Sequence, residues 1–557
     1  MISYKEKPFC LNEEDIEWVE KTYASMSIEE RIGQLFFPIG YSSDENYLKF
    51  AMLSKHPGGM LFRMGKKEEM KKAYAFLQKE SKIPMFLSAN LEAGGDGIIE
   101  EGTSFAKPMQ IAATGDKKNA YRLGKICARE GKAVGCNYAF APIVDIDKNF
   151  RNPITNVRTF GNDPDMIIEY AGEYIRACEE EGMLTSIKHF PGDGVDECDQ
   201  HILTSVNSLS KEEWDDSYGK IYKTLIEKGA RTVMVGHIAL PAYQSEEEKY
   251  LPASLSKDVL QGLLREKLGF NGMIISDATP MVGFCCAMER REAVPAAINA
   301  GCDMFLFNKD YDEDYAFMME AYQDGRLSEE RLEEANKRIL ATKASMGLHK
   351  KDNMPCADYE KYIHCTEHEE WTRECADEAV TLVKDTQHLL PVDPKRHHRV
   401  LYEILGDCAS NERVTKRFFE KMEALGFEMI PYEREVFDFT KPLPFDSVRT
   451  FKEKYDLVLY VGNIENASNK TTNRINWYTL FGLGNNMPWF VKEVPTLFVS
   501  LQNPYHLLDV PMIQTYINAY SNHDEVIDAV VEKICGRSSF KGKSPVDPFC
   551  GKEQLRR

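Results

Sequence analysis

Eight short apolar runs, separated by helical or polar segments, dominate the first 350 residues and constrain the fold more than any other feature. Each run has the length of a strand, and most are apolar at consecutive positions. Such runs are typical of parallel strands whose sheet is covered on both faces. They lie at 32–40, 58–64, 84–92, 136–146, 184–190, 230–238, 272–278 and 303–307. Eight strand–helix units favour a (β/α)8 barrel, although a doubly wound sheet has the same rhythm.

The composition changes after Gly347, where the last helical pattern of this series ends. Residues 351–375 are polar, lack a repeating apolar face and are interpreted as a linker. A second α/β series follows, with apolar runs at 398–406, 455–464, 494–504 and 512–521 and helical patterns at 411–426 and 523–535. We therefore expect a barrel domain at 1–350 and a three-layer α/β sandwich at 376–557.

Charge and cysteine content limit the classes of partner. The 557 residues include 69 Lys and Arg against 88 Asp and Glu, which gives a formal net charge of −19. An acidic surface repels phosphate backbones, so nucleic acid is not an expected partner. No apolar stretch is long enough to span a membrane, and the first residues do not resemble a secretory signal. We expect a cytoplasmic protein whose 14 cysteines stay reduced, because none forms a CxxC pair.

The fifth apolar run ends in Lys188 and His189 and leads into a polar loop that contains two glycines. The carboxyl ends of barrel strands carry the chemistry, so this loop is a candidate site. Asp199 and His201 are near enough in sequence for the carboxylate to hold one tautomer of the imidazole, which suits general acid/base catalysis. Two alternatives remain open: a solvated acidic loop, and a metal site that uses Cys198, Asp199 and His201.

A carboxylate, Asp277, lies at the tip of the seventh apolar run. Burying it is costly without partners, so we expect it to face the same pocket as His201, although a loop cap fits the pattern equally well. Further polar residues near strand ends are Asn90, Glu92, Asp145, Arg158 and His237. Together these groups suit a polyhydroxylated ligand, which needs many directional hydrogen bonds, whereas each alone is consistent with a structural role.

Several other chemistries have no support in the sequence. The motifs GxxxxGK[ST], GxGxxG and HExxH do not occur, so no nucleotide, cofactor or metal ion is predicted. Two His-rich segments, 364–368 and 395–399, resemble metal-binding patterns, but we expect both to be solvated surface.

The segment KHFPGDGVDECDQH, residues 188–201, resembles the loop signature of bacterial β-N-acetylhexosaminidases in glycoside hydrolase family 3. In that signature Lys-His-Phe-Pro-Gly-x-Gly is followed, after four residues, by Asp, a small residue and His. Other segments resemble family blocks in the family's order: 141–146, 151–164, 234–242, 264–281, 300–307 and 379–392. The resemblance covers most of the chain and implies a TIM-like barrel followed by an α/β sandwich.

The resemblance also implies a retaining double displacement. Asp277 matches the nucleophile, His201 the general acid/base, and Asp199 its partner in a His–Asp dyad. Lys188, His189 and Arg158 match residues that hold the hydroxyls of the sugar in subsite −1. From their places at strand ends, Asn90, Glu92, Asp145 and His237 are further candidates for contact with the substrate.

The chain departs from the family pattern at two places. After the third strand, Asn90 replaces an Asp, Ala93 is inserted before the glycines, and the following Arg is missing. An amide cannot replace a carboxylate's charge-assisted hydrogen bonds, each typically worth ~1.5–3 kcal/mol, so the identity of the sugar is affected most. In the loop of residues 191–201, which carries the dyad and is called the dyad loop below, Asp193 replaces the usual His and Gln200 the usual Ser.

The implied activity is that of an exo-acting β-N-acetylglucosaminidase, whose substrate is a short oligosaccharide or glycoconjugate and which needs no cofactor. A β-glucosidase or a phosphorylase is the alternative, because a neutral histidine base leaves less negative charge in the path of phosphate. A catalytically inactive sugar-binding protein is a third hypothesis, from another class. The sequence predicts no oligomeric state.

Overall fold

The computed structural model describes residues 2–350, 354–433, 440, 446–477, 479–480, 483–484 and 486–557. The chain forms two compact units, Met1–Phe105 with Lys117–Glu369, and Ala106–Asp116 with Glu370–Arg557. The short excursion into the second unit contains helix α4 (Pro108–Thr114), six of whose seven residues are buried. Its Ala113 carbonyl accepts a hydrogen bond from the Lys543 N–H at 2.9 Å. No pattern in the sequence indicates this excursion.

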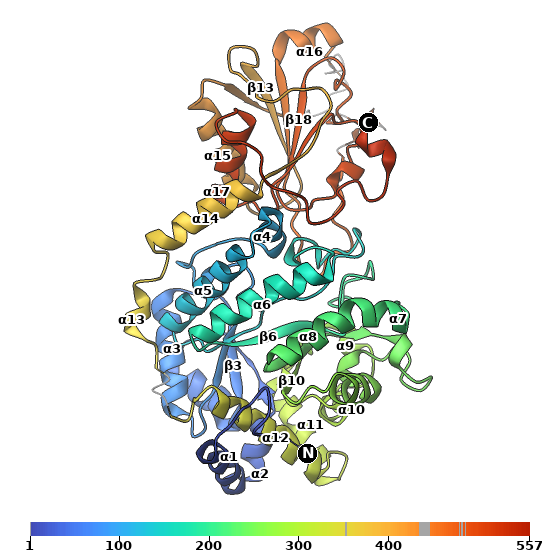
Figure 1. Ribbon diagram of the computed structural model, residues 1–557. Coiled ribbons are helices and arrows are strands. Elements are labelled where there is room, and N and C mark those ends of the chain that lie inside the picture. Colours follow the sequence, from blue (N-terminus) through green and yellow to red (C-terminus); the bar gives the residue numbers. More distant parts are fainter. Residues whose placement is uncertain are drawn as a thin grey trace. The chain divides into compact units, whose positions relative to one another are not determined.

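The first unit is a ring of parallel strands with helices outside it (Figure 1). One sheet has the order β10-β8-β6-β5-β4-β3-β2, while β11 pairs with β1 and is bridged to β10 between Met304 and Ile275. Only Pro38 separates β1 from β2, and the Gly58 N–H donates to the Phe36 carbonyl at 3.1 Å, which closes the ring. The expected (β/α)8 barrel is confirmed: the first apolar run contains both β1 and β2, and each of the other seven runs contains one strand of the ring.

The strands of the ring are β1 (Phe36–Phe37), β2 (Ile39–Gly40), β3 (Gly59–Phe62), β4 (Phe86–Ala89), β5 (Tyr138–Ala139), β6 (Leu184–Phe190), β8 (Thr232–Val235), β10 (Met273–Ser276) and β11 (Phe305–Leu306). A separate parallel pair consists of β7 (Ser205–Val206) and β9 (Ile238–Ala239). The helices are α1 (Glu13–Ser25), α2 (Ile28–Gln34), α3 (Lys67–Glu80), α5 (Lys118–Ala133), α6 (Pro164–Glu180), α7 (Lys211–Trp214), α8 (Lys220–Lys228), α9 (Val282–Cys285), α10 (Arg290–Ala300), α11 (Tyr311–Gln323), α12 (Glu329–Ser345) and α13 (Ala357–Glu360).

Local sequence explains where the outer helices begin and end. Asp163 caps α6, because its side chain accepts the Asp165 N–H, and Ser328 caps α12 by accepting the Arg331 N–H. Gly347 follows α12 with φ +68°, a conformation that glycine adopts without strain. The side chains at 167, 171, 174 and 178 of α6 are buried, as their 3.6-residue spacing predicts.

The second unit contains a six-stranded sheet in the order β12-β19-β18-β15-β13-β14, in which only β12 runs antiparallel to its neighbour. Its strands are β12 (Thr381–Asp385), β13 (Arg399–Leu405), β14 (Glu428–Pro431), β15 (Leu457–Gly462), β18 (Thr496–Ser500) and β19 (Thr515–Asn518). Its other elements are α14 (Thr366–Ala379), which begins in the first unit, α15 (Asn411–Glu423), α16 (Val448–Lys454), α17 (Asp524–Ile534) and the hairpin β16 (Thr479–Leu480) with β17 (Leu483–Gly484). Sequence analysis missed β14, because this edge strand is only partly buried and has no apolar run.

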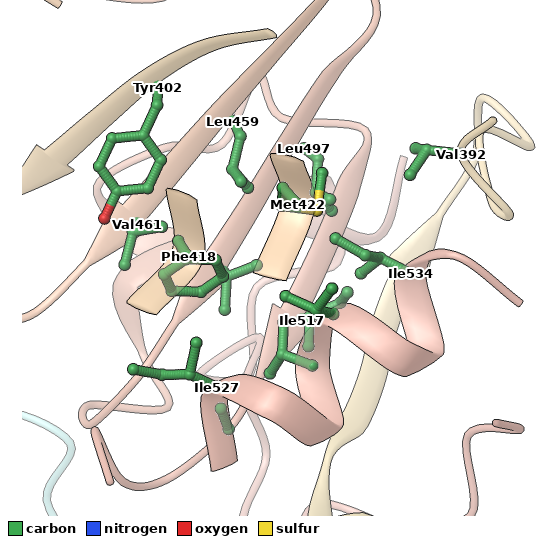
Figure 2. Packing of buried hydrophobic residues seen from close by; sticks show 14 of the residues in the cluster. Val392, Tyr402, Phe418, Met422, Leu459, Val461, Leu497, Ile517, Ile527 and Ile534 are labelled. Carbon is green, nitrogen blue, oxygen red and sulfur yellow. The ribbon is translucent and has the colours of Figure 1, made fainter. Parts of the chain in front are cut away.

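Alternation along the central strands builds a core on each face of this sheet. Leu459 and Val461 of β15 pack in one buried cluster, while Tyr460 between them belongs to the other. Figure 2 shows the first cluster, in which Phe418 of α15 and Ile527 of α17 lie over the sheet. Two apolar faces, each covered, give the expected three-layer α/β arrangement.

No helix in the described parts of the chain combines the length and the apolar character needed to cross a membrane.

An ion-pair network fastens the last two strands of the barrel. The buried Asp303 accepts hydrogen bonds from Arg265 and Arg331, both at 2.8 Å, and from the Ile274 N–H of β10. Because removing one partner of a buried pair leaves uncompensated charge, we predict that Asp303→Ala lowers the free energy of unfolding by about 3–5 kcal/mol. Urea titration followed by circular dichroism measures this. Glu246→Ala, at an exposed ion pair, is the control and should change little, whereas a similar effect in both variants would contradict the prediction.

Candidate active site

Asp277 directly follows β10, at the carboxyl end of the barrel. Its N–H donates to the Val235 carbonyl and its Oδ1 accepts the Ala278 N–H, both at 2.7 Å, so strand pairing fixes the direction of the side chain. Its Oδ2 is buried, has no hydrogen-bond partner among the described residues, and lies 3.9 Å from Nε2 of His189. A buried carboxylate oxygen with no bonded partner is costly, and this one remains available for a reaction.

Three imidazoles act on the charge of Asp277. Burial raises the pKa of its carboxyl, but electrostatic interaction with the surrounding imidazoles, with His189 foremost, opposes this and holds the pKa below its ordinary value. Asp277 is therefore an ionised carboxylate at neutral pH, as a nucleophile must be. The His201 carbonyl accepts the Val282 N–H at 3.2 Å, so His201 lies beside the loop that follows Asp277.

Asp145 fixes the orientation of His189. Its Oδ2 lies 2.7 Å from Nδ1 of His189, and its Oδ1 accepts the backbone N–H groups of His189 (3.1 Å) and Asp193 (2.8 Å). The side chain of Asp145 is fully buried. Asp145 therefore holds the His189 ring so that Nε2 faces Asp277. The predicted contact between Asp145 and a substrate stays a prediction.

The predicted dyad is formed by Asp199 and His201. Oδ1 of Asp199 lies 2.7 Å from Nδ1 of His201 and also accepts the His201 N–H at 2.9 Å. The carboxylate is fully buried, whereas the His201 side chain is 20% exposed. An ionised Asp199 makes Nδ1 the donor of this hydrogen bond, so a proton given to or taken from another molecule would be the one on Nε2.

The glycines of the dyad loop allow close packing. A Cβ at Gly192 would lie 2.1 Å from the Tyr218 ring, and one at Gly194 would lie 2.0 Å from the Ile146 carbonyl oxygen. Both residues have positive φ, of +120° and +100°. Glycine is thus required for the path of the loop across the barrel rim.

Glu92 binds two cations at once. Arg158 donates to it from Nε (3.1 Å) and Nη2 (3.0 Å), and Lys188 donates from Nζ at 2.7 Å. Burial opposes the charge on Glu92, but the attraction of both cations holds its pKa well below the ordinary value and raises that of Arg158. Three long side chains are thereby fixed as one charged, hydrogen-bonding surface.

The remaining two predicted sugar contacts lie in different environments. Asn90, just after β4, is exposed. His237 is fully buried, and its ring nitrogens lie 2.8 Å from Ser254 Oγ and 3.1 Å from the Ala278 carbonyl. Burial lowers the pKa of His237 to about 4, so its ring is neutral and supports the loop that follows Asp277. The predicted contacts of Asn90 and His237 with a substrate stay predictions.

Sequence analysis missed the support under the loop that carries Glu92. The buried Glu130 of α5 accepts the Thr103 N–H (2.8 Å), the Thr103 hydroxyl (2.6 Å) and the His364 N–H (3.2 Å). Its Oε1 also lies 2.8 Å from Nδ1 of His368, which is fully buried. Our expectation of solvated surface for 364–368 is therefore wrong for His368, because its partner comes from a helix 238 residues away in sequence. Among the described residues, no group of three or more side chains is arranged to hold a metal ion.

Comparison with known proteins gives matches over the whole chain. The family model "Glycosyl hydrolase family 3 N terminal domain" matches residues 27–342. A "β-N-acetylglucosaminidase/β-glucosidase" of Cellulomonas fimi is 41% identical over an alignment of 563 positions that covers 99% of each chain. A solved β-glucoside phosphorylase, BglX, is 43% identical, covers 100% of both chains and gives a TM-score of 0.93. A solved β-N-acetylglucosaminidase from Paenibacillus sp. shares the fold at 21% identity, with a TM-score of 0.77 over 94% of this chain and 99% of the other.

The lowered pKa of Glu92 predicts a pH-dependent contribution to stability. Ionised Glu92 stabilises the fold above the ordinary pKa of 4.5, and this contribution is lost as the pH falls through the lower folded value. Glu92→Gln should therefore lower the free energy of unfolding by about 2–4 kcal/mol at neutral pH, with the difference shrinking below about pH 4.5. Urea titrations between pH 3.5 and 7.5 measure it, with the exposed Glu100→Gln of the same loop as control. A difference that is independent of pH would contradict the assignment.

Proposed function

The chain belongs to glycosyl hydrolase family 3, and on this basis we propose that it releases terminal β-linked N-acetylglucosamine from short oligosaccharides or glycoconjugates with retention of configuration. The observation that carries the proposal is the buried Oδ2 of Asp277, which accepts no hydrogen bond from the described residues, beside the loop that carries His201. The name of the Cellulomonas fimi relative, which includes both N-acetylglucosaminidase and glucosidase activity, supports the substrate class.

In the first step, Oδ2 of Asp277 attacks the anomeric carbon while the bond to the leaving oxygen breaks. Nε2 of His201 gives its proton to that oxygen, and Asp199 stabilises the ring through Nδ1 at 2.7 Å. The product is a glycosyl ester of Asp277 together with the free aglycone. His189, 3.9 Å from Oδ2, stabilises the carboxylate before the attack and after its release.

In the second step, His201 takes a proton from water as the water oxygen attacks the anomeric carbon. The ester bond breaks, the carboxylate of Asp277 is regenerated, and the sugar leaves with its original β configuration. The cluster of Glu92, Arg158 and Lys188 offers the donors and acceptors that sugar hydroxyls require. Asn90 contributes a neutral amide where the family pattern has a carboxylate, which changes one contact with the sugar.

Phosphorolysis is the second candidate, and one observation favours it specifically. The BglX phosphorylase is 43% identical over the whole chain. In the dyad of this chain, the imidazole is 20% exposed while the carboxylate of Asp199 lies fully buried behind it. Once His201 has given its proton to the leaving group, an approaching phosphate would meet an uncharged ring rather than a carboxylate. Its ionised oxygen would attack the anomeric carbon of the glycosyl ester, the bond to Asp277 would break, and the products would be a sugar 1-phosphate and the regenerated carboxylate.

We also propose that the protein is cytoplasmic, that small glycosides are its only class of substrate, and that it does not bind nucleic acid. The net charge of −19 opposes binding to phosphate backbones. A neutral sugar is not steered by that charge, so recognition depends on the short-range contacts at the rim.

We predict that Asp277→Ala abolishes turnover of 4-nitrophenyl β-N-acetylglucosaminide, because no other described group replaces the nucleophile. A slow 5-fluoro glycosyl substrate should label the wild-type protein covalently, and peptide mapping should locate the label on Asp277. Label on any other residue would overturn the assignment of the nucleophile.

Removing the charge of the dyad should slow both steps. We predict that Asp199→Asn lowers kcat by about 10²-fold or more, since the imidazolium loses its stabilising carboxylate. Glu197→Gln is the matched control, because Glu197 belongs to the same loop but is 58% exposed and forms a surface ion pair with Arg151 at 3.6 Å. Equal activity of the two variants would contradict the role of Asp199.

Turnover with and without inorganic phosphate separates the two candidates. A hydrolase gives free sugar at a rate independent of phosphate, whereas a phosphorylase gives sugar 1-phosphate and accelerates with phosphate concentration. Testing the N-acetylglucosaminide and the glucoside in parallel assigns the sugar. No turnover of any β-glycoside under either condition would refute the proposed function.

A further inference from the structure

Two buried polar side chains, Asp193 and Gln200, anchor the loop that carries the dyad. Each residue is 2% exposed. Oε1 of Gln200 accepts the backbone N–H of His237 at 2.7 Å, just beyond the end of β8. Nε2 of the same amide donates to Oδ2 of Asp193 at 3.4 Å. The amide of Gln200 thus connects a barrel strand to the first part of its own loop.

Asp193 continues the connection toward the nucleophile. Its Oδ1 accepts the Gly194 N–H at 2.7 Å and Nδ2 of Asn152 at 3.2 Å, while its own N–H donates to Asp145 at 2.8 Å. Asp145 in turn holds His189, the imidazole beside Asp277. A chain of hydrogen bonds therefore runs from the nucleophile's neighbour to the residue that lies between the two members of the dyad.

The backbone also ties this part of the loop to the nucleophile's loop. The Gln200 carbonyl accepts the Gly283 N–H at 3.1 Å, and the His201 carbonyl accepts the Val282 N–H at 3.2 Å. Because Gln200 separates Asp199 from His201, its position decides where the dyad lies relative to Asp277.

We propose that Asp193 and Gln200 are positioning residues that clasp the dyad loop to the barrel rim and so hold His201 at the distance from Asp277 at which it can protonate the leaving oxygen. The inference deepens the proposed function and rests on the proposed role of His201. It assigns a task to the two positions of the loop at which the chain departs from the family pattern.

The electrostatic cost of Asp193 supports a specific task for this residue. Burial raises the pKa of its carboxyl to about 7, Asp145 and Asp199 add to the rise, and His189 opposes it. An acidic residue kept in so unfavourable an environment is expected to have a specific role. Here it supplies the acceptor that the Nε2 donor of Gln200 requires.

The direction of the hydrogen bond between Gln200 and Asp193 provides a specific test. Oε1 of Gln200 must accept a backbone N–H, so its NH2 group faces Asp193. Asp193→Asn would oppose one NH2 group to another. Gln200→Glu would oppose two carboxylates at a pH above the raised pKa of Asp193, so the variants are compared there. The double variant Asp193→Asn/Gln200→Glu reverses donor and acceptor and restores the hydrogen bond, while Oε1 of the new Glu still accepts the His237 N–H.

Rates with two leaving groups distinguish positioning from general damage. With a sluggish alkyl or sugar aglycone, which needs protonation by His201, we expect each single variant to lower kcat about 10–100-fold with KM nearly unchanged. With a 2,4-dinitrophenyl glycoside, which departs without a proton, glycosylation should slow by less than about threefold. The double variant should recover most of the loss with the sluggish aglycone.

Covalent titration with the slow fluoro glycosyl substrate counts intact sites, so a poorly folded variant is recognised and corrected for. Limited proteolysis gives a readout besides activity, since cleavage within 191–203 should increase in the single variants and not in the double one. Equal losses with both aglycones, or a double variant no better than the single ones, would overturn the inference. Failure of the proposed function would instead show as absent turnover in the wild-type protein.

Discussion

The cost of burying charge at the ends of parallel strands governs the arrangement of this site. A barrel brings its strand ends to one rim, where carboxylates lose water and need polar partners. Glu92 is bound between Arg158 and Lys188, and Asp145 accepts three hydrogen bonds. Asp277 is the exception, since its buried Oδ2 has an imidazole near it and no hydrogen bond from any described residue. We expect the reaction to take place at Asp277, because the described residues leave this buried carboxylate oxygen without a hydrogen bond.

Two imidazole–carboxylate pairs on this rim have different surroundings. In both, a carboxylate oxygen lies 2.7 Å from Nδ1 and leaves Nε2 for other contacts. The His189 side chain is 8% exposed and its Nε2 faces Asp277, whereas the His201 side chain is 20% exposed. The same pairing therefore suits a fixed electrostatic neighbour in one case and a proton carrier in the other.

Most of the fold was predictable, because continuous apolar runs reveal buried parallel strands one at a time. The eight runs of the barrel and its TIM-like class are confirmed, as is membership of the family. Prediction failed where a segment depends on distant partners. The edge strand β14 carries no apolar run, 106–116 joins the second unit, and His368 is buried only because Glu130 lies opposite it.

The sequence by itself determined the succession of strands and helices in both units and the residue types available at each strand end, since hydrophobic periodicity and motif spacing are local properties. It also identified Asp199 and His201 as a pair, because they are only two residues apart. Only the tertiary structure decided which residues from different strands contact one another and which side chains support the others. Whether a carboxylate is free, paired or shielded depends on how the chain folds around it. The partners of Glu92 are 66 and 96 residues away in sequence, and the link between Asp193 and Gln200 depends on the path of their loop, so both emerged only from the folded chain.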